Sequence, residues 1–432
     1  MTDTEISTLR AWEALDSRGR PTVACEVLLA GGARGVAAVP SGASTGRHEA
    51  RELRDGGERY GGRGVRAAVG NVVGELADAA RGLPAGDQGA LDAALRAADG
   101  SEDLGRLGAN AVLAVSVASA LAAAAAHGRP LWRHLGDRPL LPLPMVNILS
   151  GGAHAGAAID LQDFLAVPVG ASSFAEAIEW AGRVRAAAAE LVAERGLVAA
   201  LVADEGGLGP ALASNRAALE LLSRAIERAG LVAGEQVGIA IDVAATQLVD
   251  PAGGYRLRVE DRTLAAAELV AELRGWADEH PIVSIEDPLG EDDWDGWACA
   301  SRELGGLQLL GDDLFATNPT RLRRGIAGGV GNAVLVKPNQ IGTLSAAREV
   351  VGLAHDAGYA TVLSARSGET EDAWLADLAV GWRTGQLKVG STMRSERTAK
   401  WNRLLQIEAE LGDEAQYAGA DALAGAAPGG VR

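Results

Sequence analysis

The sequence predicts an α/β fold, a (β/α)8-type barrel with an N-terminal α+β capping domain. In roughly the last two thirds of the chain, short apolar runs alternate with helical stretches. Each apolar run ends in a polar residue, and from Glu286 onward these ends recur about every 25 residues. Continuous apolar strands that alternate with helices are typical of a parallel sheet buried on both faces. At least six such units in series favour a closed barrel over an open sheet. The expected strands are 238–242, 282–286, 307–312, 333–337, 360–364 and 386–388.

The first third of the chain has a different rhythm. Strand-like runs between residues 22 and 39 precede helical runs between residues 65 and 127. Gly and Pro cluster at 128–130 and again at 139–144. These residues stop helices and build linkers, so the boundary is expected there. The predicted domains are a capping domain at 1–135 and a catalytic barrel at 136–432.

The net charge of the chain is −17. A broadly acidic surface argues against nucleic acid or an anionic membrane as the main partner. It does not exclude an anionic substrate, because a few cations or a bound metal invert the field inside a cleft. The expected partner is therefore a small molecule.

Two cysteines, Cys25 and Cys299, provide no disulfide framework, so a reducing cytoplasm is the expected location. The first ten residues are polar and do not resemble a signal peptide. The Ala-rich run at 121–126 is too short to span a bilayer, and we expect it to belong to a buried helix.

Charged residues end five of the six predicted strands, at the edge of a barrel where active sites form. Three carboxylates that converge there repel one another unless a cation lies between them, and ligands that offer only oxygen suit Mg²⁺. The sequence therefore predicts a magnesium site and, beside it, two lysines. The residues are Asp242, Glu286, Asp312, Lys337 and Lys388.

The lysines are the candidates for a base. A nearby dication favours the neutral amine and lowers the pKa of a lysine toward the range of a working base. The same metal stabilises the negative charge that forms when the proton next to a carboxylate leaves. The residues therefore predict metal-assisted removal of such a proton.

Nine short strings, taken together in their order and spacing, resemble the enolase family over nearly the whole chain. Barrel enzymes of the mandelate racemase type lack the second of these strings. The strings are LDSRGRPTV (15–23), VPSGASTG (39–46), GGAH (151–154), DEGG (204–207), SIEDP (284–288), GDDL (311–314), KPNQIGT (337–343), RSGETED (366–372) and SERTAK (395–400).

The resemblance implies a role for each matching residue. It implies that Asp242, Glu286 and Asp312 bind a structural Mg²⁺ and that Ser44 completes a second metal site with substrate. It also implies that Lys337 is the base and that Lys388 binds the substrate carboxylate.

Further matching residues lie at the leaving-group and phosphoryl ends of the implied substrate. Glu205 resembles the acid that assists the leaving hydroxyl, with Gln162 and Asp163 beside it. His154 lies in a closing loop, and Arg366 and Ser367 resemble phosphoryl contacts. The implied assembly is a homodimer.

Three positions depart from the family pattern. The family has His where this chain has Ala365, and Glu where Asp163 follows Gln162. It usually has Val after the base lysine, where this chain has Pro338. Ala365 removes an imidazole from the phosphoryl end, and Asp163 shortens a carboxylate near the leaving hydroxyl by one methylene.

These departures leave three hypotheses. The main one is a specialised paralog for a phosphorylated or phosphonylated three-carbon acid, such as carboxyphosphonoenolpyruvate synthase of phosphonate biosynthesis. The second is an ordinary glycolytic enolase that dehydrates 2-phosphoglycerate. The third is a catalytically weak binding or structural homolog. The retained lysines and carboxylates argue against the third.

Overall fold

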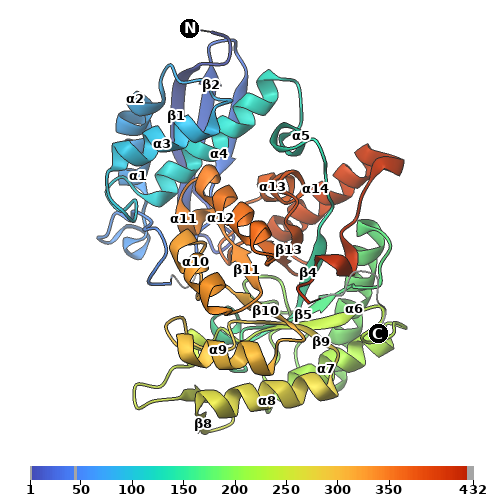
Figure 1. The fold of residues 1–432 in the computed structure, drawn as a ribbon. Coiled ribbons are helices and arrows are strands. Elements are labelled where there is room, and N and C mark those ends of the chain that lie inside the picture. Colours follow the sequence, from blue (N-terminus) through green and yellow to red (C-terminus); the bar gives the residue numbers. More distant parts are fainter. Residues whose placement is uncertain (1, 43–45, 426–432) are drawn as a thin grey trace.

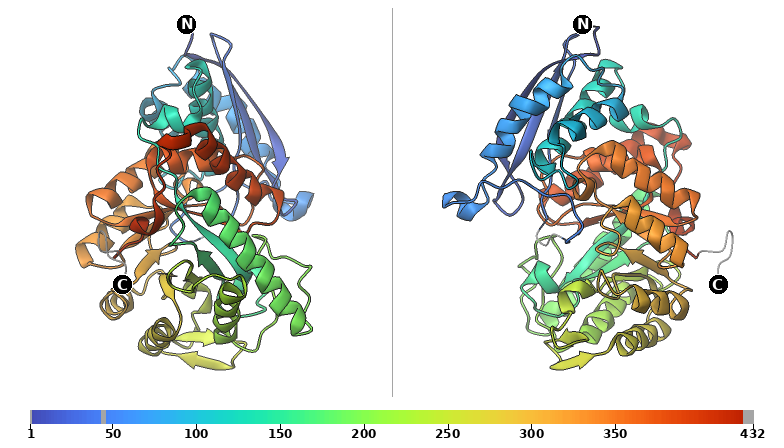
Figure 2. Two further views of the ribbon diagram at one scale, coloured as in Figure 1. Left: turned by 90° about the vertical axis from the view of Figure 1, so that its right-hand side faces the viewer. Right: turned by 60° about the vertical axis from the view of Figure 1, so that its left-hand side comes forward.

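The computed structural model describes residues 2–42 and 46–425. The N-terminal domain lies above a barrel in Figure 1, and the two turned views in Figure 2 show the same arrangement. One sheet belongs to the N-terminal domain and a second, closed sheet forms the barrel. The predicted capped barrel is therefore confirmed.

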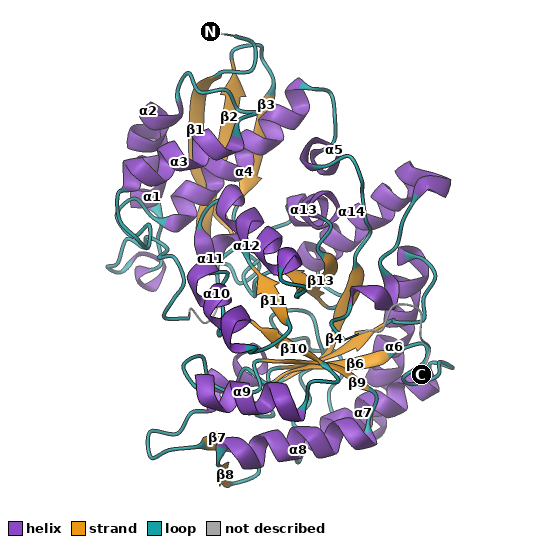
Figure 3. Ribbon diagram, in the orientation of Figure 1, coloured by secondary structure: helices purple, strands orange, loops and turns teal. Residues whose placement is uncertain are grey.

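The N-terminal domain consists of an antiparallel sheet and a layer of helices, as Figure 3 shows. Its elements are β1 (Ile6–Leu15), β2 (Pro21–Leu29), β3 (Arg34–Ala38), α1 (Arg66–Asn71), α2 (Ala77–Ala80), α3 (Gln88–Asp99), α4 (Ala109–Ala126) and α5 (Leu131–Leu135). The strands lie in the order β1-β2-β3, and α4 packs across β2 and β3. The expected helical run at 65–80 is interrupted at Gly74, whose backbone is not helical.

Helix α4 is apolar on all sides. Among the described residues it is the one helix long and apolar enough to cross a membrane, and 83% of that stretch is buried inside the protein. A helix that is hydrophobic all round is accounted for by burial in a core. The structure thus gives α4 a place between the sheet and the other helices of its domain.

Eight strands close the barrel in the order β10-β11-β12-β13-β4-β5-β6-β9. Its interior is filled by apolar side chains from these strands, including Met145, Leu165, Leu310 and Leu335. The strands are β4 (Leu143–Ser150), β5 (Asp163–Val167), β6 (Gly238–Asp242), β9 (Ile282–Glu286), β10 (Gln308–Gly311), β11 (Ala333–Val336), β12 (Ala360–Ser364) and β13 (Gly385–Gly390). The remaining strands, β7 (Tyr255–Leu257) and β8 (Arg262–Leu264), form a separate hairpin.

Strand β5 runs antiparallel to both of its neighbours, β4 and β6, whereas the expected sheet was parallel throughout. No α-helix lies between β4 and β5, and a chain that returns without a crossover pairs antiparallel. The reversal puts the start of β5, rather than its end, at the functional edge. Asp163 is consequently paired in register with Asp242.

Helices surround the barrel, as Figure 1 shows. They are α6 (Phe174–Glu194), α7 (Asn215–Arg228), α8 (Ala266–Glu279), α9 (Trp294–Glu303), α10 (Pro319–Gly328), α11 (Pro338–Ile341), α12 (Leu344–Asp356), α13 (Trp374–Trp382) and α14 (Ser395–Leu411). Helix α11 explains Pro338, because proline is favoured at the first position of a helix, where its missing N–H is not needed.

The contact between β3 and α4 generates a stability prediction. A Cβ at Gly35 would meet the backbone carbonyl of Ala118 and the backbone nitrogen of Ala122 far inside van der Waals contact. Because backbone atoms cannot move aside like a side chain, Gly35→Ala should destabilise the protein by about 1–3 kcal/mol or more. Thermal unfolding followed by circular dichroism measures the effect.

Gly70→Ala is the matched control. Gly70 lies in α1, and a Cβ there has no atom within 4 Å, so alanine should leave stability unchanged or raise it slightly. A Gly35→Ala protein that melts with the wild type would contradict the close packing of β3 on α4.

Candidate active site

Lys388, at the end of β13, lies between two carboxylates. Its Nζ is 2.8 Å from Oδ2 of Asp242 and 2.7 Å from Oε2 of Glu286. Burial raises the pKa of Glu286 well above its ordinary value, and the charge of Asp242 raises it further. Burial acts to lower the pKa of Lys388, but Asp242 and Glu286 outweigh it and hold that pKa well above its usual range. Lys388 is therefore a cation, surrounded by acids.

The second lysine of the rim, Lys337, follows β11. Its Nζ donates a hydrogen bond to Oδ2 of Asp312 at 2.5 Å, and Nε2 of Gln340 donates to the other oxygen at 3.1 Å. Burial acts to lower the pKa of Lys337, but the carboxylate of Asp312 outweighs it and raises the pKa. The amine is thus protonated while Asp312 is its partner.

Three carboxylates, Asp287, Asp312 and Asp313, have oxygens within 4.8 Å of one another. Asp287 accepts hydrogen bonds from the backbone N–H of Asp312 at 3.0 Å and of Asp313 at 2.7 Å. Burial, reinforced by the charge of Asp312, raises the pKa of Asp313 to about 7. Such closely placed, buried oxygens can share a divalent cation.

Sequence reasoning did not single out Asp287 and Asp313, although both lie inside the strings SIEDP and GDDL. Each directly follows a predicted ligand, Glu286 or Asp312. The signal that could have found them is a pair of consecutive acidic residues at each of two strand ends, Glu286-Asp287 and Asp312-Asp313.

His154, Asp163 and Glu205 form a cluster on the other side of the rim. Nδ1 of His154 is 2.9 Å from Oδ2 of Asp163, and its Nε2 is 3.9 Å from Glu205. The other oxygen of Asp163 accepts hydrogen bonds from Ser150 at 2.9 Å and from Asn147. Asp163 is fully buried, with both oxygens occupied, so it holds the imidazole in place.

The charges around His154 decide its protonation. Burial acts to lower the pKa of His154, but Asp163 and Glu205 outweigh it and raise the pKa to about 9. Glu205 has a lowered pKa because His154 and Arg397 outweigh its burial. His154 is therefore an imidazolium between Glu205 and Asp163, and burial raises the pKa of Asp163 itself.

Arg366 and its neighbours form the remaining wall. Nη1 of Arg366 is 2.8 Å from Oε2 of Glu49 and 3.1 Å from Oδ1 of Asn339. Glu49 comes from the N-terminal domain, and sequence reasoning missed it. Ala365 is 5% exposed, and its backbone N–H donates to the carbonyl of Lys388 at 2.9 Å.

A narrow cavity of about 40 Å³ lies among these groups. Its lining includes the predicted residues His154, Gln162, Glu205, Asp242, Asp312, Lys337, Ala365, Arg366, Ser367 and Lys388. Gln162 donates to Asp242 at 3.1 Å. Glu286 and Asp163 support these residues from behind, and Ser44 lies outside the described residues. The lining brings the cations Lys337, Lys388 and Arg366 together with carboxylates that could hold a metal, which suits a small acid with several negative charges.

The capped barrel and its rim of buried lysines and carboxylates define a class of enzymes that act on small acids with a divalent metal. Comparison with known proteins places the chain within this class. The model of the enolase N-terminal domain matches residues 6–135, and that of the enolase C-terminal TIM barrel domain matches residues 138–426. The chain is 53% identical over 420 residues to a protein of Rubrobacter xylanophilus named enolase, covering 96% of this chain and 97% of that protein.

The chain therefore belongs to the enolase family, as its strings predicted. Enzymes of this family are lyases of the phosphopyruvate hydratase type.

The imidazolium of His154 generates a pH prediction. The folded-state pKa, about 9, lies above the ordinary value of 6.5, so the native protein holds one more proton than the unfolded chain between these values. This contribution to stability is complete below pH 6.5 and is lost as the pH rises toward 9, with a slope of at most about 1.4 kcal/mol per pH unit. The melting temperature should therefore fall less steeply between pH 7 and 9 in His154→Gln than in wild type.

His355→Gln provides the control. Burial lowers the pKa of His355, so its removal should leave the slope above pH 7 as in wild type. Equal slopes for wild type and His154→Gln would show that His154 is neutral at pH 7.

Proposed function

We propose that this protein catalyses the Mg²⁺-dependent, reversible dehydration of 2-phosphoglycerate to phosphoenolpyruvate. The observation that carries this proposal is the use of lysine. The chain holds 40 basic residues besides histidine, of which three are lysines, Lys337, Lys388 and Lys400, and the other 37 are arginines. Arginine does not lose its proton in proteins, whereas a lysine in the right surroundings does. A chain that uses arginine almost everywhere thus keeps two of its three lysines in one cavity.

The oxygen donors on the rim suit Mg²⁺. Asp242, Glu286 and Asp312 are the residues that would hold it, with Asp287 and Asp313 beside them. Lys388 contacts both Asp242 and Glu286, whereas Lys337 pairs with Asp312. The acids whose oxygens lie within 4.8 Å of one another together with Asp312 are Asp287 and Asp313. Bound Mg²⁺ would supply positive charge for the electrons that collect on the substrate carboxylate when the neighbouring proton leaves.

Each residue of the cavity has a role in this reaction. Lys337 takes the proton from C2, since a cation on Asp312 would release its amine from the ion pair. Lys388 stays charged and binds the substrate carboxylate. The imidazolium of His154 supplies the proton that Glu205, ionised beside it, passes to the departing hydroxyl. Arg366 with Ser367 receives the phosphoryl group.

We infer that the protein works as a homodimer. Trp12 and Leu15 on β1 and Val36 on β3, the two outer strands of the N-terminal sheet, are 44%, 58% and 43% exposed, and such uncovered large apolar side chains suit an interface. One chain has a mass of 44.1 kDa, so sedimentation should give twice that value, and a monomeric mass would exclude this assembly.

The free thiols of Cys25 and Cys299 support a reducing compartment, the cytoplasm.

The activity and the base are tested together. Purified protein with Mg²⁺ should convert 2-phosphoglycerate to phosphoenolpyruvate, and Lys337→Ala should slow exchange of the C2 proton with deuterium from solvent by about 10³-fold or more. Lys337→Arg keeps a positive charge beside Asp312 but cannot act as a base, so it should be equally impaired. NMR spectra in deuterated water measure the exchange, and a Lys337→Arg protein that exchanges at the wild-type rate would contradict the role of Lys337.

A second function, that of a specialised paralog with a larger or phosphonylated substrate, is supported by one observation. Ala365 lines the cavity between Arg366 and Lys388, at the phosphoryl end, where its methyl group occupies less space than the imidazole of the family. Asp163 is also short, and it contacts His154 instead of the cavity. An enzyme such as carboxyphosphonoenolpyruvate synthase is the type of paralog that these two changes would suit.

Restoring the imidazole distinguishes the two functions. A charge-assisted hydrogen bond to a phosphoryl oxygen contributes about 1.5–3 kcal/mol, or one to two decades of rate. If the paralog hypothesis holds, wild type is a poor 2-phosphoglycerate dehydratase, and Ala365→His, best with Asp163→Glu, raises that activity. If wild type already turns over tens of molecules per second, above the median of enzymes, the protein is an ordinary enolase.

A further inference from the structure

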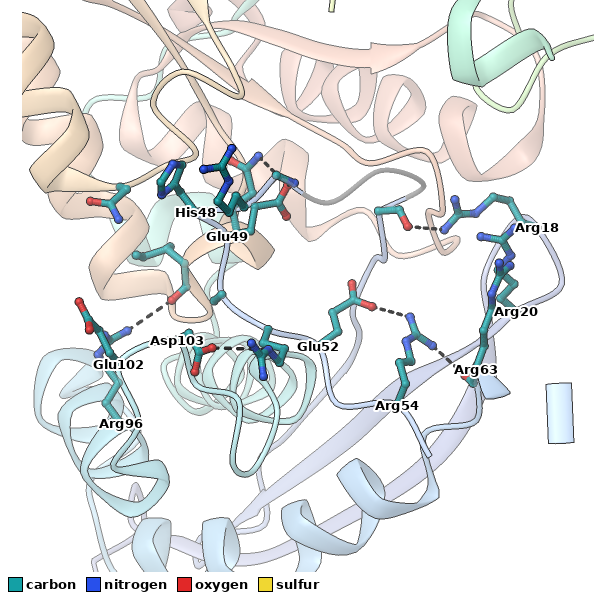
Figure 4. A pocket seen from close by; sticks show the side chains of 18 residues that line it. Arg18, Arg20, His48, Glu49, Glu52, Arg54, Arg63, Arg96, Glu102 and Asp103 are labelled. Carbon is teal, nitrogen blue, oxygen red and sulfur yellow. Dashed lines mark hydrogen bonds and ion pairs between the residues drawn. The ribbon is translucent and has the colours of Figure 1, made fainter. Parts of the chain in front are cut away.

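A second cavity, of about 680 Å³, opens beside the catalytic one (Figure 4). The two cavities meet at Glu49, which lines both. Seven arginines line this outer cavity against four carboxylates. Because the whole chain carries a net charge of −17, this excess of positive charge next to the active site is a local reversal of the field.

Four of the arginines lie on one side of the outer cavity. Figure 4 shows Arg18, Arg20, Arg54 and Arg63 there, with Glu52 beside Arg54. Arg54 ties the group together, since its Nη1 donates to the backbone carbonyls of Pro21 at 2.7 Å and of Arg63 at 3.0 Å. Its Nη2 is paired with Glu52. The single carboxylate in this group is thus already occupied.

The guanidinium groups of Arg20 and Arg63 differ from that of Arg54 in their partners. Within residues 2–42 and 46–425, neither guanidinium has an ion pair or a hydrogen bond to another residue. Burial lowers the pKa of Arg18, Asp16 opposes this, and the charge of Arg20 lowers it again, so like charges lie close enough to repel. Exposed arginines are often simply hydrated, but several that converge without enough acids are suited to an anion with more than one oxygen.

We propose that Arg20, Arg54 and Arg63 form an outer anion site, which binds the phosphoryl group of the substrate before the substrate enters the catalytic cavity. The inference rests on the proposed function, because it takes the substrate to be a phosphorylated acid. The outer site raises the concentration of that anion at the entrance, against the repulsion of an acidic protein. It contributes to capture and not to the chemical step, since no residue of the site lines the catalytic cavity.

The double variant Arg20→Gln/Arg63→Gln tests the site, while Arg54 is kept because it holds the backbone. At low ionic strength, kcat/KM for 2-phosphoglycerate should fall about five- to tenfold, with kcat within about twofold of wild type, as expected for a loss of electrostatic capture. At an ionic strength of about 0.5 M the difference should shrink, because salt screens exposed charges. An unchanged kcat/KM at low ionic strength, or an equal loss in kcat, would overturn the proposal.

Arg302→Gln/Arg348→Gln is the matched control. These arginines are exposed on α9 and α12, and among the described residues neither has an ion pair, so the control removes the same charge elsewhere. It should keep the wild-type kcat/KM at every ionic strength. A fall equal to that of Arg20→Gln/Arg63→Gln would assign the effect to net charge and overturn the outer site.

A binding measurement without substrate separates this inference from the proposed function. Inorganic phosphate is titrated into metal-free protein and followed by its ³¹P resonance. Its affinity should weaken about fivefold or more in Arg20→Gln/Arg63→Gln and stay unchanged in the control. If the protein does not turn over 2-phosphoglycerate, the proposed function fails, and this titration alone decides the outer site. Phosphate that binds equally to all three proteins would overturn the site, whatever the kinetics.

Discussion

The ammonium group of Lys388 lies within 2.8 Å of both Asp242 and Glu286, and the arrangement of the barrel depends on this buried contact. Unpaired charges are costly to bury, so each member of the contact needs the others. The three residues come from three strands, β13, β6 and β9, which a closed barrel brings to one rim. Lys337 and Asp312 repeat the same contact from β11 and the end of β10. A metal that binds these carboxylates would neutralise the negative charge that now raises the pKa of both lysines. The pKa of each lysine would then fall, so metal binding and lysine protonation are linked.

The reversed strand β5 adds a second cluster of charged residues to the rim. Its start, Asp163, faces the end of β6 and holds His154 as an imidazolium next to Glu205. In a fully parallel barrel the start of a strand would lie at the opposite end. The antiparallel pairing of β4 and β5 therefore puts Asp163, and with it His154, at the same rim as the two lysines. The carboxylate of Asp163 contacts His154, and Asp163 is not among the residues that line the cavity.

Much of this structure could be predicted from the sequence, for identifiable physical reasons. Apolar strands that end in polar residues predicted β6, β9, β10, β11, β12 and β13, because their pattern repeats with the length of a βα unit. The reversal of β5 could not be predicted in this way, since an apolar run looks the same in a parallel and in an antiparallel strand. Glu49 was missed because it reaches the cavity from another domain, a contact that no local pattern shows. Asp287 and Asp313 were missed because each follows an acid that already explained the pattern.

The proposed reaction requires that Asp242, Glu286 and Asp312 act as one magnesium site. Titration calorimetry of Mg²⁺ into metal-free protein tests it directly, with Asp242→Asn, Glu286→Gln and Asp312→Asn beside the wild type. Glu235→Gln, which changes an exposed acid, is the control. Each of the three variants should lose at least about tenfold in affinity, or 1.4 kcal/mol, while the control binds as the wild type does. Wild-type affinity in all three variants, or no binding of Mg²⁺ to the wild type, would contradict it.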